Sequence, residues 1–210
     1  MSTETISEIN AFWLGSSLDN AEAASDRRDW WYRGGVAVDD DIRARFGGLV
    51  QQACARDLMA WQATPDGALA LILLLDQFTR NLYRNTPQAY MGDECAFEIV
   101  RRAIEQKFDK ALPPVSRIWL YHPFHHAEEV EDQDRGIALL NELRQEAAVE
   151  WRPYVERSIE GWTRHRDIVA QFGRFPHRNA VLGRGTTDDE AEFLNANSEA
   201  FGQGPKPAAA

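Results

Sequence analysis

Three of the five histidines in this chain lie within five residues, at His122, His125 and His126. An imidazole titrates near neutral pH and can therefore exchange protons with a bound molecule. His126 and the nearby Glu128 are candidates for general acid–base catalysis. His122 and His126 have the four-residue spacing of zinc ligands on a helix, but Pro123 disfavours helical geometry at His122. We therefore expect Pro123 to start a new helix and the segment to bind no metal.

A second polar segment follows the most apolar stretch of the chain, residues 68–75. Asp76 and Arg80 are four residues apart, as are Gln77 and Asn81, so each pair shares one face of a helix. A buried polar group without a partner costs about 1–3 kcal/mol. These four side chains therefore either form hydrogen bonds inside the fold or line a ligand cavity, and the sequence leaves both alternatives open.

A third segment is locally basic in an acidic chain. Residues 164–184 contain five arginines and one acid, whereas the whole chain has a formal charge of −10. If Pro176 lies in the first turn of a short helix, the free N–H groups of that turn and the nearby arginines form an anion site. Alternatively, the segment forms salt bridges with residues 128–134, which contain five acids and neither Lys nor Arg. The candidates in this segment are Arg174, Arg178 and Asn179 for ligand binding, and His165 and His177 for proton transfer.

The hydrophobic pattern places these segments on helices. Apolar positions recur at helical spacing, and no strand pattern is found. We expect an all-α fold of about eight helices, joined by short loops into antiparallel pairs. The expected helices are a first one with a capping box at Thr5, then about 39–54, one from Thr64, one capped by Asp93 and reaching 108, a short one near 115–119, 124–148, 152–172 and a last one from Thr187.

Two segments are expected to lie outside these helices. Residues 16–38 contain three adjacent aromatic residues, Trp30 to Tyr32, followed by two glycines. We interpret them as an irregular arm that stays ordered, because exposed aromatic rings are costly. Residues 201–210 are expected to form a flexible tail. Residues 1–200, which include this arm, are expected to form a single domain.

The composition disfavours several classes of protein. A formal charge of −10 disfavours binding to nucleic acid and to anionic membranes. The longest apolar run has eight residues, too few to span a bilayer, and the N-terminus lacks signal-peptide features, so we expect a cytoplasmic protein. Cys54 and Cys95 are interpreted as buried thiols. No cofactor motif is recognised and no cofactor is expected, and a homodimer is left open.

The three polar segments resemble motifs of a bacterial family called domain of unknown function 924. The similarity extends over residues 12–194. Thr79 and Ala127 stand where this family typically has Pro and often has Ser. The matching motifs are residues 74–81, 123–128, 165–168 and 172–179. The resemblance implies a tetratricopeptide-like α-α superhelix, and it implies no reaction.

Three functional hypotheses follow from these segments. The first is a binding protein that holds a small anion, a carboxylate-bearing metabolite or a peptide terminus, with Arg80, Arg174 and Arg178 supplying charge. The second is an enzyme in which His126 and Glu128 transfer a proton, with a histidine of the basic segment as second carrier and arginines stabilising negative charge. The third is a protein-interaction module whose polar clusters are internal locks. We favour the first.

Overall fold

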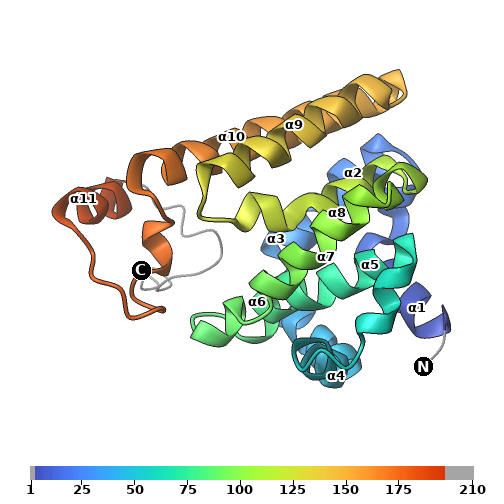
Figure 1. Ribbon diagram of the computed structural model, residues 1–210, viewed down its shortest axis with the longest axis horizontal. Coiled ribbons are helices and arrows are strands. Elements are labelled where there is room, and N and C mark those ends of the chain that lie inside the picture. The colour runs from blue at the N-terminus through green and yellow to red at the C-terminus, as the bar shows by residue number, and fades with distance from the viewer. Residues whose placement is uncertain (1–2, 197–210) are drawn as a thin grey trace.

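The computed structural model describes residues 3–196, and this part of the chain contains helices and loops but no strand (Figure 1). Eight of its α-helices have eight or more residues, in agreement with the expected number. The all-α prediction is therefore confirmed, whereas the superhelical arrangement stays a prediction. The α-helices are α1 (Thr3–Leu14), α2 (Ala21–Asp26), α3 (Arg28–Arg33), α4 (Gly35–Cys54), α5 (Pro65–Ile72), α6 (Thr79–Leu82), α7 (Asp93–Glu105), α8 (Pro114–His126), α9 (Val130–Glu146), α10 (Arg152–Phe172) and α11 (Asp188–Ala196).

Shorter helical segments connect several of these helices. One of them, η3 (Leu73–Phe78), is a π-helix. The 3-10 segments are η1 (Gly15–Leu18), η2 (Met59–Ala63), η4 (Pro87–Tyr90), η5 (Phe108–Ala111), η6 (Val149–Trp151) and η7 (Pro176–Arg178). None of the described helices is long and apolar enough to cross a bilayer.

α5 lies at the centre of the fold because its sequence has no polar face. Thr64 accepts a hydrogen bond from the Gly67 N–H and Pro65 occupies the first turn, so α5 begins where the sequence predicts. Residues 68–75 are each at most 1% exposed. The chain continues from α5 through η3 into α6, so the polar residues 76–81 start from the most buried part of the protein.

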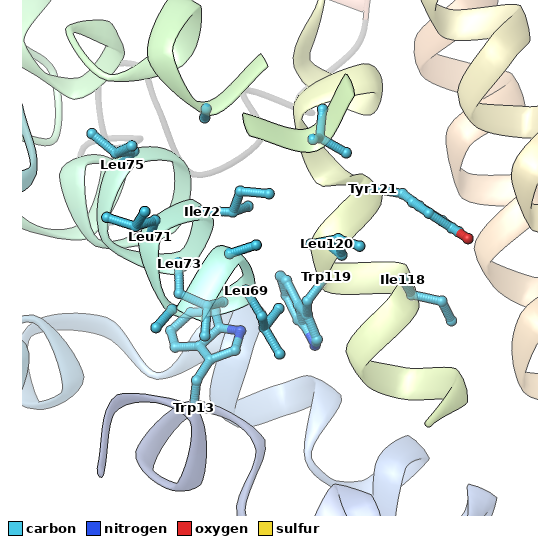
Figure 2. Packing of buried hydrophobic residues seen from close by; sticks show 14 of the residues in the cluster. Trp13, Leu69, Leu71, Ile72, Leu73, Leu75, Ile118, Trp119, Leu120 and Tyr121 are labelled. Atoms are coloured by element: carbon cyan, nitrogen blue, oxygen red, sulfur yellow. The ribbon is translucent and has the colours of Figure 1, made fainter. Parts of the chain in front are cut away.

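α8 packs against α5 and carries the histidine-rich segment. The indole of Trp119 meets that of Trp13 from α1, with ring centroids 5.1 Å apart and planes at 82°. Figure 2 shows both indoles facing the apolar side chains of α5. Ile118 and Tyr121 point to the opposite side of α8 (Figure 2).

The expected helix start at Pro123 is wrong, because α8 runs without a break from Pro114 to His126. A proline in a last turn removes one backbone hydrogen bond, whereas every residue from Val115 to His125 is buried. Tertiary packing therefore outweighs the local preference. The expected helix over 124–148 is correspondingly divided, with α9 starting only at Val130.

α9 and α10 form a long antiparallel pair along one side of the molecule (Figure 1). Their close approach to α8 depends on Gly136, where an added Cβ would lie 2.8 Å from atoms of both Phe124 and Trp162. α10 ends at Gly173 with a left-handed φ of 68°, as its sequence predicts. This pair carries the basic segment toward the end of α8.

The expectation of an irregular arm over residues 16–38 is also wrong. The segment forms η1, α2 and α3, and α4 already begins at Gly35 instead of at the acids 39–41. Helices of six residues are too short to show a periodic pattern, but burying Trp31 stabilises them. Trp31 donates its indole N–H to the Trp13 carbonyl at 2.8 Å. The expected tail, residues 201–210, lies outside the described residues.

Candidate functional site

The π-helical segment η3 places a carboxylate in the interior. Asp76 is fully buried. Its Oδ1 lies 2.7 Å from His126 Nδ1 and 3.1 Å from the Arg80 guanidinium, and its Oδ2 accepts a hydrogen bond from Gln77. π-Helical turns are rare and occur frequently at functional sites. The sequence prediction that Asp76 and Arg80 share a face is confirmed.

The guanidinium of Arg80 already donates hydrogen bonds to a carboxylate and to the backbone. It donates to both carboxylate oxygens of Asp93 at 2.8 and 2.9 Å and to the Asp76 carbonyl at 2.7 Å. Asp93 reaches this position because Gly92 packs directly against η3, where a Cβ would lie 2.2 Å from the Leu75 carbonyl oxygen. Asp93 therefore does not cap α7, as the sequence suggested, but is its first residue and follows the cap residue Gly92.

His126 stands at the end of α8 with a defined tautomer. Because Asp76 is an acceptor, the Nδ1–H of His126 donates to it, and Nε2 forms no hydrogen bond among the described residues. Burial lowers the pKa of His126 well below 6.5, and the charges of Arg80, His122 and Arg178 act in the same direction. The nearby Asp76 opposes this shift, but its charge is already shared with Arg80. His126 is therefore a neutral imidazole with an available lone pair.

Arg178, from η7, lies beside His126 and has unused donors. Its guanidinium carbon stands 4.9 Å from the ring centre of Tyr90 and 4.4 Å from that of Phe175. Among the described residues its only hydrogen bond goes to the His126 carbonyl at 3.1 Å, and the Glu128 carboxylate is 3.6 Å away. Its Nε is buried without a partner in this part of the chain. Burial lowers the pKa of Arg178, which nevertheless stays charged near neutral pH.

These groups line one cavity of about 470 Å³ between α7, the end of α8 and η7. Asp76, His126 and Arg178 contribute to its wall. Phe97 and Pro123 add apolar surface. The further polar lining residues are Asp93, Glu94, Glu98, Arg101, Glu128 and Asp132.

Most carboxylates of this cavity are already neutralised. Five of its six acidic residues take part in ion pairs with arginines, for example Asp132 with Arg101 and Glu128 with Arg184. Glu94, which is exposed, forms no ion pair among the described residues. Burial raises the pKa of Glu128, but the hydrogen bonds from Arg184 and the Phe175 N–H, together with the charges of Arg178 and Arg184, outweigh this effect and the pKa is lowered.

Glu128 also shows that the acidic and basic segments do pair with each other. Its carboxylate accepts hydrogen bonds from Arg184 at 2.6 Å and from the Phe175 N–H at 3.0 Å. Arg166 pairs with Asp134 at 2.8 Å. The salt-bridge alternative from the sequence is therefore confirmed, and Glu128 holds the basic segment in place.

Several predicted site residues lie away from the cavity. Asn81 donates to Asp39 at 2.7 Å, in a network with Arg84. Gln77 donates to Asp76 and does not meet Asn81.

A separate network fixes the turn after η7. Arg174 forms a bidentate pair with Glu190 at 2.6 and 2.8 Å, and Asn179 donates to the same carboxylate at 3.1 Å. Thr187 and Glu190 form the predicted capping box of α11. Arg174 and Asn179 therefore stabilise the fold of the basic segment and are absent from the cavity wall.

His165 and His177 are also separate from His126. His165 lies against His125, with ring centroids 3.9 Å apart, and lines a second cavity. Burial lowers its pKa to about 4. His177 neighbours Phe175, and burial together with Arg178 lowers its pKa to about 3. Both are neutral at pH 7, but neither is in the wall of the first cavity.

The sequence did not reveal three contributors, Asp93, Tyr90 and Arg184. Tyr90 is partly buried, its hydroxyl has no partner among the described residues, and its ring lies close to Arg178. The local sequence of η4 does not indicate that Tyr90 lies beside Arg178. Within the described residues, no group of three His, Cys, Asp or Glu side chains is arranged to hold a metal ion.

Together, fold and site define an all-helical protein with a buried Asp–His pair and an arginine beside a cavity. The chain belongs to the family of bacterial proteins of unknown function DUF924, whose model matches residues 9–198. It is similar to a solved structure of a protein of unknown function from Agrobacterium tumefaciens, with 32% identity and a TM-score of 0.74. That similarity covers 94% of this chain and 100% of the other. No curated protein matches this chain.

Proposed function

We propose that the cavity beside Asp76, His126 and Arg178 binds a small carboxylate-bearing molecule and that His126 exchanges a proton with it. The observation that carries the proposal is the 2.7 Å contact between Asp76 Oδ1 and His126 Nδ1. It leaves Nε2 of a neutral imidazole available in the wall of a cavity. A general base needs a free lone pair and a fixed orientation, and Asp76 supplies the orientation.

Arg178 supports a carboxylate as the anionic part of the ligand. A guanidinium has five N–H donors in a planar fork, and Arg178 uses one of them among the described residues. A carboxylate is the group that such a fork binds best. Arg80 and Arg174, by contrast, already hold Asp93 and Glu190 in bidentate pairs. Of the three arginines expected to bind an anion, we therefore keep only Arg178 in the proposed binding site.

Glu94 suggests a second feature of the ligand. It is an exposed acid in the lining and forms no ion pair among the described residues. A ligand with an amino group would neutralise it. Amino acids and peptide C-termini with a nearby basic group are therefore the first compounds to test.

The proposal is tested by a thermal-shift screen of amino acids and small carboxylates at constant ionic strength. A ligand at 100 times its dissociation constant should stabilise the protein by about 2.7 kcal/mol. The shift should disappear in Arg178→Gln. Arg152→Gln is a control for the loss of one positive charge, because Arg152 is exposed and is not in the cavity wall. A shift that survives Arg178→Gln would contradict the assignment of the binding site.

Proton exchange needs a separate measurement. Each hit is incubated with the protein in D₂O and followed by proton NMR for exchange or product formation. Wild-type protein should react, and His126→Gln, which keeps a hydrogen-bond donor, should bind the hit without reacting. Binding without reaction in wild type would leave a binding protein and contradict the catalytic role of His126.

A further inference from the structure

A second cavity of about 400 Å³ lies between α3, α8 and α10, and its charge is opposite to that of the first. Its basic lining residues are Arg28, Arg33, Arg157 and Arg164, and its one acidic residue is Asp29. The end of α8 separates the two cavities, with His126 lining the first and His125 lining the second.

Three of these arginines have no carboxylate partner. Asp29 pairs with Arg33 at 3.5 Å, whereas Arg28, Arg157 and Arg164 form no ion pair among the described residues. The chain has 33 acids for 23 Lys and Arg residues, so three arginines without an ion pair at one cavity are unexpected. Like charges that are close together repel each other, and a bound anion would relieve this repulsion.

Gly161 is the second observation, because the fold does not explain it. A glycine in the interior of a helix destabilises it relative to alanine. At Gly161 an added Cβ would meet only the far end of Arg164, at 3.9 Å, so packing does not require a glycine. Gly161 lies in α10 between Arg157 and Arg164 and lines the same cavity. Its missing side chain keeps the surface between the two arginines open.

The opposite wall is aromatic. Tyr32 is 58% exposed and is stacked on Trp119 at a centroid distance of 6.3 Å. Arg28 lies over the Tyr32 ring at 5.2 Å. Trp119 and His125 each have a buried ring nitrogen without a partner among the described residues. An exposed aromatic face beside cations is suited to a planar ring that carries negative charge.

We propose that this second cavity is a binding site for a small aromatic dianion, of the chemical class of an aryl phosphomonoester. Arg28, Arg157 and Arg164 bind the anionic group across the open surface at Gly161, and the ring packs against the exposed part of Tyr32. The site is independent of the carboxylate site proposed above, because the two share no lining residue.

Isothermal titration with phenyl phosphate at constant ionic strength tests this proposal. Wild-type protein should bind it at least tenfold more tightly than inorganic phosphate. The double variant Arg157→Gln/Arg164→Gln should weaken binding at least tenfold. Arg102→Gln is the matched control, because Arg102 is also an exposed helical arginine without an ion pair in the described part of the chain. It should leave the affinity unchanged.

Gly161 provides a variant that separates binding from folding. Gly161→Leu should fill the surface between the arginines and abolish binding while the folded state is retained, as circular dichroism would show. Three results would each overturn the proposal: no binding of phenyl phosphate to wild type, equal affinity for inorganic phosphate, or unchanged affinity in the double variant.

Discussion

Acidification should destabilise this protein well before its carboxylates titrate. All five histidines have pKa values below the ordinary 6.5, and in each case burial is the main cause. The pKa is lowered to about 4 for His122 and His165 and to about 3 for His177. The unfolded chain therefore binds more protons than the folded chain below pH 6.5, and stability must fall as the pH falls.

The magnitude follows from the difference between the pKa of a histidine in the folded chain and its pKa in the unfolded chain. For a group shifted from 6.5 to 4, lowering the pH from 7 to 5 removes about 1.8 kcal/mol of unfolding free energy. We count the buried His122 in full and the partly exposed His165 and His177 at half, because solvent screens them. These three histidines together remove about 3.6 kcal/mol, a large part of the 5–15 kcal/mol that is typical of whole domains. The lowered pKa values of His125 and His126 act in the same direction.

Most shifted carboxylates act below this pH window. Asp93 is the exception, because burial raises its pKa, and its protonation opposes the effect of the histidines. The lowered pKa values of Glu128, Glu146 and Glu190 give stability that is present above about pH 4.5 and lost below it. Between pH 7 and pH 5 the histidines therefore dominate. Four of them form a contiguous group, with His125 between His122, His126 and His165 at centroid distances of 3.9 to 5.7 Å.

Urea unfolding followed by tryptophan fluorescence measures this loss. With a slope of about 2 kcal/mol per molar urea, the midpoint should fall by about 2 M or more between pH 7 and pH 5. His122→Phe keeps the stacking on Trp119, which has a centroid distance of 4.1 Å, and should reduce the pH-dependent loss by about 1.8 kcal/mol. A midpoint that moves by less than about 0.5 M in wild type would refute the buried, neutral histidine group.

Two further predictions concern packing and buried hydrogen bonds. Gly136→Ala should destabilise the fold by roughly 1–3 kcal/mol because its Cβ meets Trp162 at 2.8 Å, whereas Gly161→Ala should stabilise it by roughly 0.5–1 kcal/mol. Opposite shifts in the thermal midpoint check the pair, and shifts of the same sign would contradict it. Tyr121→Phe should cost about 1–3 kcal/mol in urea unfolding, because the buried Asp109 loses its 2.7 Å hydrogen bond. An unchanged midpoint would show that water replaces the hydroxyl.

The sequence was a sufficient guide where a periodic pattern or a specific cap determines the structure. The capping residue Thr64, the apolar run 68–75 and the helix-ending Gly173 were all placed correctly. It failed where tertiary packing outweighs a local preference, at Pro123 inside α8 and in the short helices of residues 16–38. Both errors follow from interactions between segments that a local pattern does not contain.

The candidate site could be predicted in its residue types but not in its connections. Asp76 and His126 were both singled out, yet their contact joins positions 50 residues apart. It requires the π-helical turn at η3 and an unbroken α8, neither of which the sequence indicated. Asp93 was expected to cap its helix, and its pairing with Arg80 depends on the close approach of Gly92 to η3.

Residue type alone does not distinguish an internal lock from a binding group, but the number of unused donors does. Arg174 and Arg178 are four residues apart in one motif, and both are flanked by carboxylates. Arg174 has a bidentate partner in Glu190 and a backbone acceptor, so a ligand would have to displace existing bonds. Arg178 makes one hydrogen bond among the described residues and lies in a cavity wall. A ligand can therefore bind Arg178 without breaking the fold, which is why the functional proposal rests on Arg178 and treats Arg174 as a lock.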